Sequence, residues 1–215
     1  KAHHVGNYYL CEQIKIDENR LNIKKSYEDV LSNNIADCGY LLEMDSKEDE
    51  DTKYTTSNGV PVKFKDDKIE GTTLYTAVSE KIQSIENYLD AGNYTEAYKM
   101  LDINSVIDQM LIWELTMNRE YGDPGSVYMY MDGDGKLCAG PVWDFDRGTF
   151  QNQEKATALG NSTPYRVKPD NAWMYLRTQE SEKYSYIWYR QLVKDATFQQ
   201  TIQQRWEVIR PYLDM

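Results

Sequence analysis

The stretch VYMYMDGDGKLCAGPVWDFD, residues 127–146, decides how the chain folds around its most distinctive motif. The run VYMYM before the Asp-Gly-Asp-Gly sequence at 132–135 and the apolar residues after it predict a strand, a tight turn and a second strand. The run lacks the third ligand and the distal Glu of a calcium-binding loop, so we interpret it as a hairpin turn.

The end of this stretch places Asp144 and Asp146 between Trp143 and Phe145. If the second strand continues through them, both carboxylates face one side and both aromatic rings face the other. Two carboxylates on one face suit a solvated strand end. They equally suit a site for Mg²⁺, which prefers hard oxygen ligands. The residues alone leave both interpretations open.

The rest of the chain changes its hydrophobic period from strand-like to helical. Strands are expected at 6–14, 38–45 and in a hairpin over 52–65 that turns at Asn58-Gly59. Residues 26–34 suggest a short helix capped by Ser26. After residue 70 the apolar spacing predicts helices over 74–89, 95–101 (capped by Thr95), 104–120, 181–193 and 198–213. We therefore expect a single α+β domain over 1–215, with a strand-rich portion 1–70 and a helical portion 71–215 that contains the hairpin 126–150.

Composition excludes several classes of function. The formal net charge of −11 disfavours nucleic-acid binding, which needs a basic surface. No apolar run reaches the length of a membrane span. Cys11, Cys38 and Cys138 form no CxxC or Cys/His cluster, so a structural zinc site is not expected. The opening residues read as a strand and carry no signal peptide, which suggests that the segment starts inside a domain.

Further candidate residues precede the Asp pair. Glu114 and Asn118 are spaced to share a helical face, and Glu120 follows them. They could form a structural polar network or the acid/base half of a site, and a single hairpin separates them from Asp144. Lys63 and Lys65 alternate on a strand, where they are either surface residues or phosphate contacts. The chain has no Gly-x-Ser-x-Gly, His-Glu-x-x-His or P-loop motif.

Several segments, taken in order, resemble the CotH kinase family, the atypical protein kinases named for spore coat protein H. The matching segments are GNYYLCEQIKIDENRLNI (6–23), GYLLEMD (39–45), SNGVPVKFK (57–65), DINSVIDQMLIWELTMNRE (102–120), SVYMYMDGDGKLCAGPVWDFDRGTF (126–150) and WYRQLVKDATFQQTIQQRW (188–206). The Trp-Asp-Phe-Asp block is the most specific of them. The resemblance covers most of the chain.

The resemblance implies an atypical protein-kinase-like fold and ATP-dependent phosphoryl transfer, with Mg²⁺ or Mn²⁺, to a Ser or Thr hydroxyl of a partner protein. It also implies a bacterial protein that is secreted or held at the cell surface, and a family domain that begins upstream of Lys1. By this resemblance Asp144 is the principal metal ligand and Asp146 its neighbour. The nucleotide side is expected to include Lys65, Lys63, Glu12 and Glu43.

The catalytic carboxylate is expected just after Asn118. Family members commonly have Asn-x-Asp there, whereas this chain has Asn118-Arg119-Glu120, with Asp123 close by. The longer Glu side chain moves its carboxylate by roughly 1 Å, a displacement that matters for a positioned base. Two alternatives therefore stay open: a non-catalytic surface or coat pseudokinase that binds a partner, and a metal-dependent glycosyltransferase that uses Asp-x-Asp. The absence of an alternating βαβ pattern disfavours the second.

Overall fold

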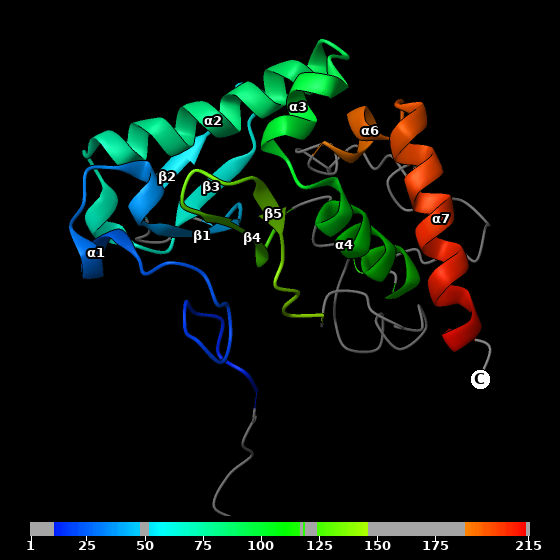
Figure 1. Cartoon of the computed structure of the whole chain (residues 1–215), viewed down its shortest axis with the longest axis horizontal. Coiled ribbons are helices and arrows are strands. Elements are labelled where there is room, and N and C mark those ends of the chain that lie inside the picture. The colour runs from blue at the N-terminus through cyan, green and yellow to red at the C-terminus, as the bar shows by residue number, and fades with distance from the viewer. Residues whose placement is uncertain (1–10, 48–51, 117, 119–123, 146–187, 214–215) are drawn as a thin grey trace, which may run out of the picture.

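The computed structural model describes residues 11–47, 52–116, 118, 124–145 and 188–213 (Figure 1). The chain is α+β, as expected: a mixed fold with one antiparallel sheet and several helices. In chain order the elements are α1 (Tyr27–Val30), η1 (Ile35–Asp37), β1 (Gly39–Met44), β2 (Thr52–Thr55), β3 (Pro61–Phe64), η2 (Asp67–Ile69), α2 (Thr73–Asp90), α3 (Tyr94–Met100), α4 (Ile103–Thr116), β4 (Val127–Asp132), β5 (Leu137–Ala139), α6 (Tyr189–Leu192) and α7 (Ala196–Leu213).

The five strands of this sheet lie in the order β2-β3-β1-β4-β5, and every neighbouring pair is antiparallel. Strand β1 lies at the centre and pairs with both β3 and β4, so the hairpin near residue 130 joins the same sheet as the early strands. Both expected hairpin turns form, because Gly59 and Gly133 adopt the left-handed φ values of 84° and 60° that these turns require.

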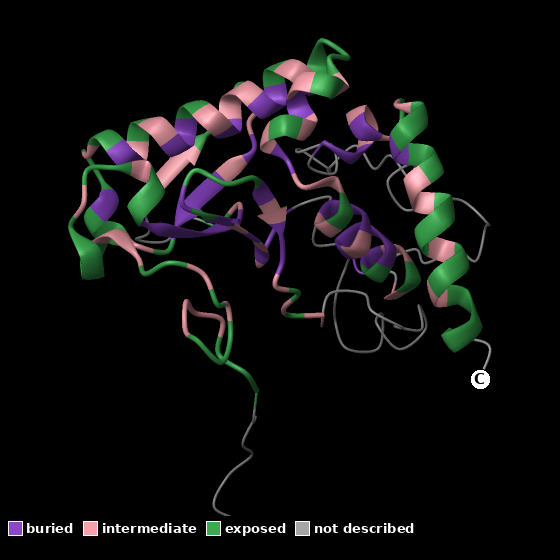
Figure 2. Ribbon diagram, in the orientation of Figure 1, coloured by how far each residue is buried: buried purple, intermediate pink, exposed green. Residues whose placement is uncertain are grey.

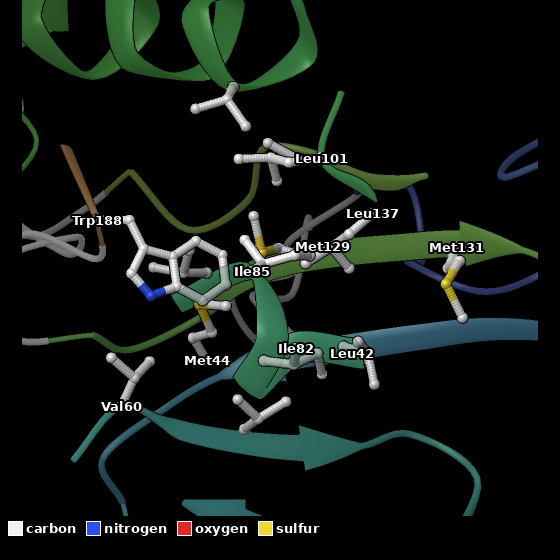
Figure 3. Close-up of a cluster of buried hydrophobic side chains, with 14 of the residues drawn as sticks. Leu42, Met44, Val60, Ile82, Ile85, Leu101, Met129, Met131, Leu137 and Trp188 are labelled. Carbon is white, nitrogen blue, oxygen red and sulfur yellow. The ribbon is translucent and has the colours of Figure 1, made fainter. Parts of the chain in front are cut away.

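One face of the sheet packs on α2. The core residues between them include Leu42, Met44, Met129, Ile82 and Ile85, all buried (Figure 3). Leu42 and Met44 lie opposite Phe64 and Val62 of β3, so the alternation of each strand sends its apolar side chains to this face. Figure 3 also shows Trp188 in this cluster, which brings the C-terminal part of the chain into the core under α2.

Helices α4 and α7 lie side by side beyond the sheet (Figure 1). Arg205 of α7 and Asp108 of α4 join them through two N···O contacts of 2.5 and 2.7 Å. Strand β1 is buried along its whole length, whereas α7 is mostly exposed (Figure 2). No helix in the described part of the chain is both long enough and apolar enough to cross a membrane.

Three local expectations were wrong. Residues 11–14 form no strand, and the earlier part of the expected 6–14 strand lies outside the described residues. Helix α3 is capped by Asn93, whose side chain accepts the backbone N–H of Glu96, rather than by Thr95. Asn accepts this hydrogen bond as well as Thr does, and it stands two residues earlier.

Helix α4 is the third correction. It ends at Thr116, four residues before the expected end. The backbone N–H of Asn118 donates to the carbonyl of Trp113, five residues back, so the chain has left the α-helical hydrogen-bond ladder there. Asn118 and Glu114 therefore do not share a helical face. Of the helix expected at 181–193, the described part is α6, and residues 181–187 lie outside the described residues.

Candidate functional site

The second face of the sheet carries buried charge. Glu43 of β1 lies directly opposite Lys63 of β3, with Asp45 and Lys65 one step along the same face. We call these four residues the charged face. Period-2 alternation explains it: Val62 and Phe64 point to the α2 side, so Lys63 and Lys65 must point to the other.

Two diagonal ion pairs connect the charged face. The Lys63 ammonium lies 2.8 Å from an Asp45 carboxylate oxygen, and both side chains are almost fully buried, at 0% and 7% exposed. The Lys65 ammonium lies 3.0 Å from Glu43, where the lysine is 30% exposed and the carboxylate 8%. Lysine and carboxylate side chains are rarely buried unless paired. The pairing therefore explains how the sheet tolerates this charge.

Tyr128 of β4 extends the charged face. It stands directly opposite Glu43 on the other side of β1. The pKa of its hydroxyl is raised, first by burial and next by the negative charge of Glu43 and a hydrogen bond to it, while the positive charge of Lys65 acts in the opposite direction. The Tyr128 hydroxyl therefore lies within electrostatic reach of both members of the Lys65–Glu43 pair.

The stretch that holds the expected catalytic residues approaches the charged face at the end of β1. The backbone N–H of Ser46, next to Asp45, donates to the carbonyl of Pro124 over 2.7 Å. Asn118 is fully buried. Glu120 and Asp123 lie outside the described residues, but Pro124 directly follows Asp123 in the chain. The assignments of Glu120 and Asp123 stay predictions.

The segment that carries the Trp-Asp-Phe-Asp motif follows strand β5. Strand β5 ends at Ala139, so it does not continue through Asp144, and the arrangement of faces that a strand would give there does not apply. A cis peptide bond joins Gly140 and Pro141, and Asp144 adopts a left-handed φ of 57°, a conformation that Asp enters more readily than most residues. The Gly140 N–H donates to the Tyr128 carbonyl over 2.9 Å. The motif is therefore carried on an irregular segment that leaves the sheet beside Tyr128.

The Asp144 side chain is exposed, as a metal ligand that meets a bound nucleotide needs to be. Asp146, its expected neighbour, lies outside the described residues. Within the described ranges, no three His, Cys, Asp or Glu side chains gather closely enough to hold a metal ion. Asp144 offers the oxygen donor that Mg²⁺ prefers, and the partly exposed Lys65 suits a phosphate oxygen, so the chemistry of these two side chains fits a magnesium nucleotide.

Glu12 lies apart from these residues. Its side chain is largely exposed and forms an ion pair of 2.6 Å with Arg20, in the N-terminal segment that Figure 1 draws away from the sheet. Of the residues expected on the nucleotide side, the structure thus brings together Glu43, Lys63 and Lys65. The role of Glu12 stays a prediction.

The oxygen atoms of the turn after β4 are bound by a lysine side chain. The Lys81 ammonium of α2 lies 3.0 Å from both the carbonyl and a carboxylate oxygen of Asp134, and 2.7 Å from the carbonyl of Gly135. These oxygens resemble a partial calcium loop, yet a lysine satisfies them. The Asp-Gly-Asp-Gly run is therefore a hairpin turn tied to α2.

Sequence reasoning missed Asp45 and Tyr128 as members of the site. Asp45 follows Glu43 by two residues, which is the spacing that puts both on one strand face. That signal was available. Tyr128 could not be found in this way, because its position opposite Glu43 depends on the pairing of β4 with β1, which lie more than 80 residues apart.

This arrangement defines an α+β protein in which Asp45, Pro124 and Gly140, the residue that begins the Asp144 segment, lie at one end of the sheet. The family model for "CotH kinase protein" matches residues 1–213, nearly the whole chain. The chain therefore belongs to the CotH kinase family, and its membership indicates a kinase-like protein. Searches among curated proteins and among solved structures found no match.

Proposed function

We propose that this chain is an ATP- and Mg²⁺-dependent protein kinase with an atypical protein-kinase-like fold, which phosphorylates Ser or Thr hydroxyls of a partner protein. We also propose that the protein acts outside the bacterial cell or at its surface, as family resemblance suggests. One observation supports the catalytic part of the proposal: in a member of this family, the charged face lies on the strands that Pro124, which follows the stretch after Asn118, and Gly140, which begins the Asp144 segment, contact through backbone hydrogen bonds.

Phosphoryl transfer asks a protein mainly for positioning and charge neutralisation. In the proposed reaction a lysine of the charged face holds phosphate oxygens of the nucleotide, and Lys65 is the more accessible of the two. Asp144, with Asp146, would hold the metal ion. When bound, Mg²⁺ supplies positive charge that offsets the charge of the phosphates.

A carboxylate after Asn118 would accept the proton of the substrate hydroxyl. We assign this role to Glu120 and give Asp123 as the second candidate, because both follow Asn118 in the stretch that ends beside Asp45. A general base must come within hydrogen-bond reach of the hydroxyl. The buried Asn118 anchors the start of this stretch.

The test is transfer of the γ-phosphate of ATP to a Ser/Thr protein substrate, measured with the whole chain, Mg²⁺ and an Asp144→Asn variant. Asp144→Asn keeps the side-chain shape and removes the charge. The matched control is Asp134→Asn, which alters an exposed Asp in the hairpin turn at the opposite end of β5. We expect Asp144→Asn to lower transfer by at least about 100-fold, since a metal ligand contributes several kcal/mol of charge stabilisation.

Wild-type protein that binds no magnesium nucleotide would refute the kinase proposal. Wild-type protein that binds it and transfers nothing would favour the pseudokinase, for which Glu120 in place of the family's usual Asp is the supporting observation. The glycosyltransferase alternative has less support, because the strands described here form an antiparallel sheet without βαβ units.

A further inference from the structure

The two lysines of the charged face differ in their access to a ligand. Lys63 is completely buried and its ammonium lies 2.8 Å from Asp45. Lys65 is 30% exposed, so its ammonium can meet a ligand that arrives from solvent while it still touches Glu43 at 3.0 Å. Similar positions in the sequence therefore serve different purposes: Lys63 stabilises the sheet, and Lys65 can reach out of it.

Tyr128 reaches Lys65 through Glu43. Glu43 of the central β1 lies directly opposite Tyr128 of β4, and Lys65, which directly follows β3, reaches Glu43 diagonally from the other side. Glu43 is buried and interacts with both Lys65 and Tyr128. A buried carboxylate that receives two hydrogen bonds is held in one orientation, and it fixes the ammonium that it contacts.

The backbone of Tyr128 is held equally firmly. Its carbonyl accepts the N–H of Gly140 over 2.9 Å and the side-chain amide of Gln109 over 3.3 Å. Gly140 begins the segment that carries Asp144, and Gln109 belongs to α4. Tyr128 therefore stands where the sheet, α4 and the Asp144 segment meet, and its hydroxyl points back to the charged face.

We propose that Lys65, rather than Lys63, is the lysine that contacts the nucleotide phosphates, and that Tyr128 is a positioning residue that holds Lys65 through Glu43. This inference rests on the proposed function, because it concerns the same nucleotide site. Tyr128 need not touch the nucleotide. The Tyr128 hydroxyl donates a hydrogen bond to Glu43. Glu43 in turn holds the Lys65 ammonium in an orientation from which it can also contact a phosphate oxygen.

Removing the Tyr128 hydroxyl has two consequences. Glu43 loses one of its hydrogen-bond donors, so its orientation is less fixed. Its full charge then acts on Lys65 and competes with the phosphate. Both effects weaken phosphate binding, and we expect Tyr128→Phe to raise the KM for ATP about 5- to 20-fold while kcat changes less than about 3-fold.

The experiment compares the binding of Mg-ATP and of adenosine to the whole chain by calorimetry, together with steady-state kinetics. Tyr128→Phe should weaken ATP binding and leave adenosine binding unchanged, because only the phosphates meet Lys65. A general loss of structure would weaken both ligands. The matched control is Tyr130→Phe, on the same strand and face but opposite Leu41 instead of Glu43, and we expect it to bind both ligands as wild type does.

A double-mutant cycle tests the path through Lys65. Lys65→Gln should lose the preference for ATP over adenosine, and adding Tyr128→Phe to it should change ATP binding less than 2-fold. Equal effects of Tyr128→Phe in both backgrounds, or wild-type ATP binding by Tyr128→Phe, would overturn the inference while the kinase proposal stands. A wild-type chain that fails to bind Mg-ATP would overturn both.

Discussion

The buried Lys63–Asp45 pair gives a direct test of how the charged face is held together. Lys63→Met keeps most of the side-chain volume and removes the ammonium, which leaves the buried Asp45 carboxylate without the cation at 2.8 Å. Removing one partner of a buried pair costs about 3–5 kcal/mol. Because Asp45 still accepts the backbone N–H of Lys47 over 2.9 Å, we expect a loss near the lower limit, about 3 kcal/mol.

The free energy of unfolding, measured by urea denaturation at pH 7, checks this value. The matched control is Lys68→Met, which removes the ammonium of an exposed ion pair with Glu28 at 3.1 Å. Exposed pairs contribute about 0–1 kcal/mol, so the control should stay close to wild type. Replacing Asp45 by Asn in the Lys63→Met background should recover part of the loss, since the unpaired charge disappears. If Lys63→Met costs less than about 1 kcal/mol, the charged face does not depend on this pair.

Three further outcomes follow from single contacts. The buried Ser79 hydroxyl of α2 has no hydrogen-bond partner in the described structure, so Ser79→Ala should raise the unfolding free energy by about 0.5–1 kcal/mol. The control Ser84→Ala removes an exposed hydroxyl of the same helix and should change the unfolding free energy less. Burial, and next the hydrogen bond to Asp195, raises the pKa of Tyr98 above its unfolded value near 10. The unfolding free energy should therefore fall as the pH rises above about 10. Tyr98→Phe should reduce this dependence on pH, measured by urea denaturation from pH 8 to 11. Arg205→Ala should lower the unfolding free energy slightly at low salt and less at 1 M NaCl, because its half-exposed ion pair joins α4 and α7 at the surface.

Local sequence signals predicted most of the fold. The spacing of Leu74, Val78, Ile82, Ile85 and Leu89 predicted α2, and all five side chains are buried in it. The Asn58-Gly59 turn and the strand before Asp45 were also confirmed. These features depend on residues close together in the chain, which is where periodicity and turn chemistry are informative.

The end of α4 and the path of the Asp144 segment could not be predicted in this way. Leu115 and Met117 continue the apolar character of the helix, so no residue in the stretch signals an end at Thr116. The Gly140 N–H donates to the Tyr128 carbonyl in register with the β4–β5 pairing, and the segment leaves the sheet after this bond. Strand pairing, which joins residues far apart in the chain, also decided that Lys63 is buried and Lys65 is partly exposed.

Both carboxylates of the charged face, Glu43 and Asp45, come from β1 or the residue just after it, which differs from the arrangement in typical protein kinases. There, a β3 lysine pairs with a glutamate on a mobile helix. Helix α2 does carry a buried glutamate, Glu86. It lies on the opposite side of the sheet from Lys63 and Lys65, where it accepts the backbone N–H of Asn58 at 2.9 Å and the indole N–H of Trp188 at 3.1 Å.

Strand register, rather than helix position, therefore sets the lysine–carboxylate pairs of this chain. Glu86 also accepts the side-chain amide of Gln83 over 3.3 Å, and Glu86→Gln presents an amide N–H₂ to at least one of these three donors, so we expect it to lower the unfolding free energy by about 1–3 kcal/mol. On the proposed function, the same variant should bind Mg-ATP within about 2-fold of wild type at temperatures where it is folded. A large loss of ATP binding by folded Glu86→Gln protein would mean that α2 controls the nucleotide site after all, as the mobile helix does in typical kinases.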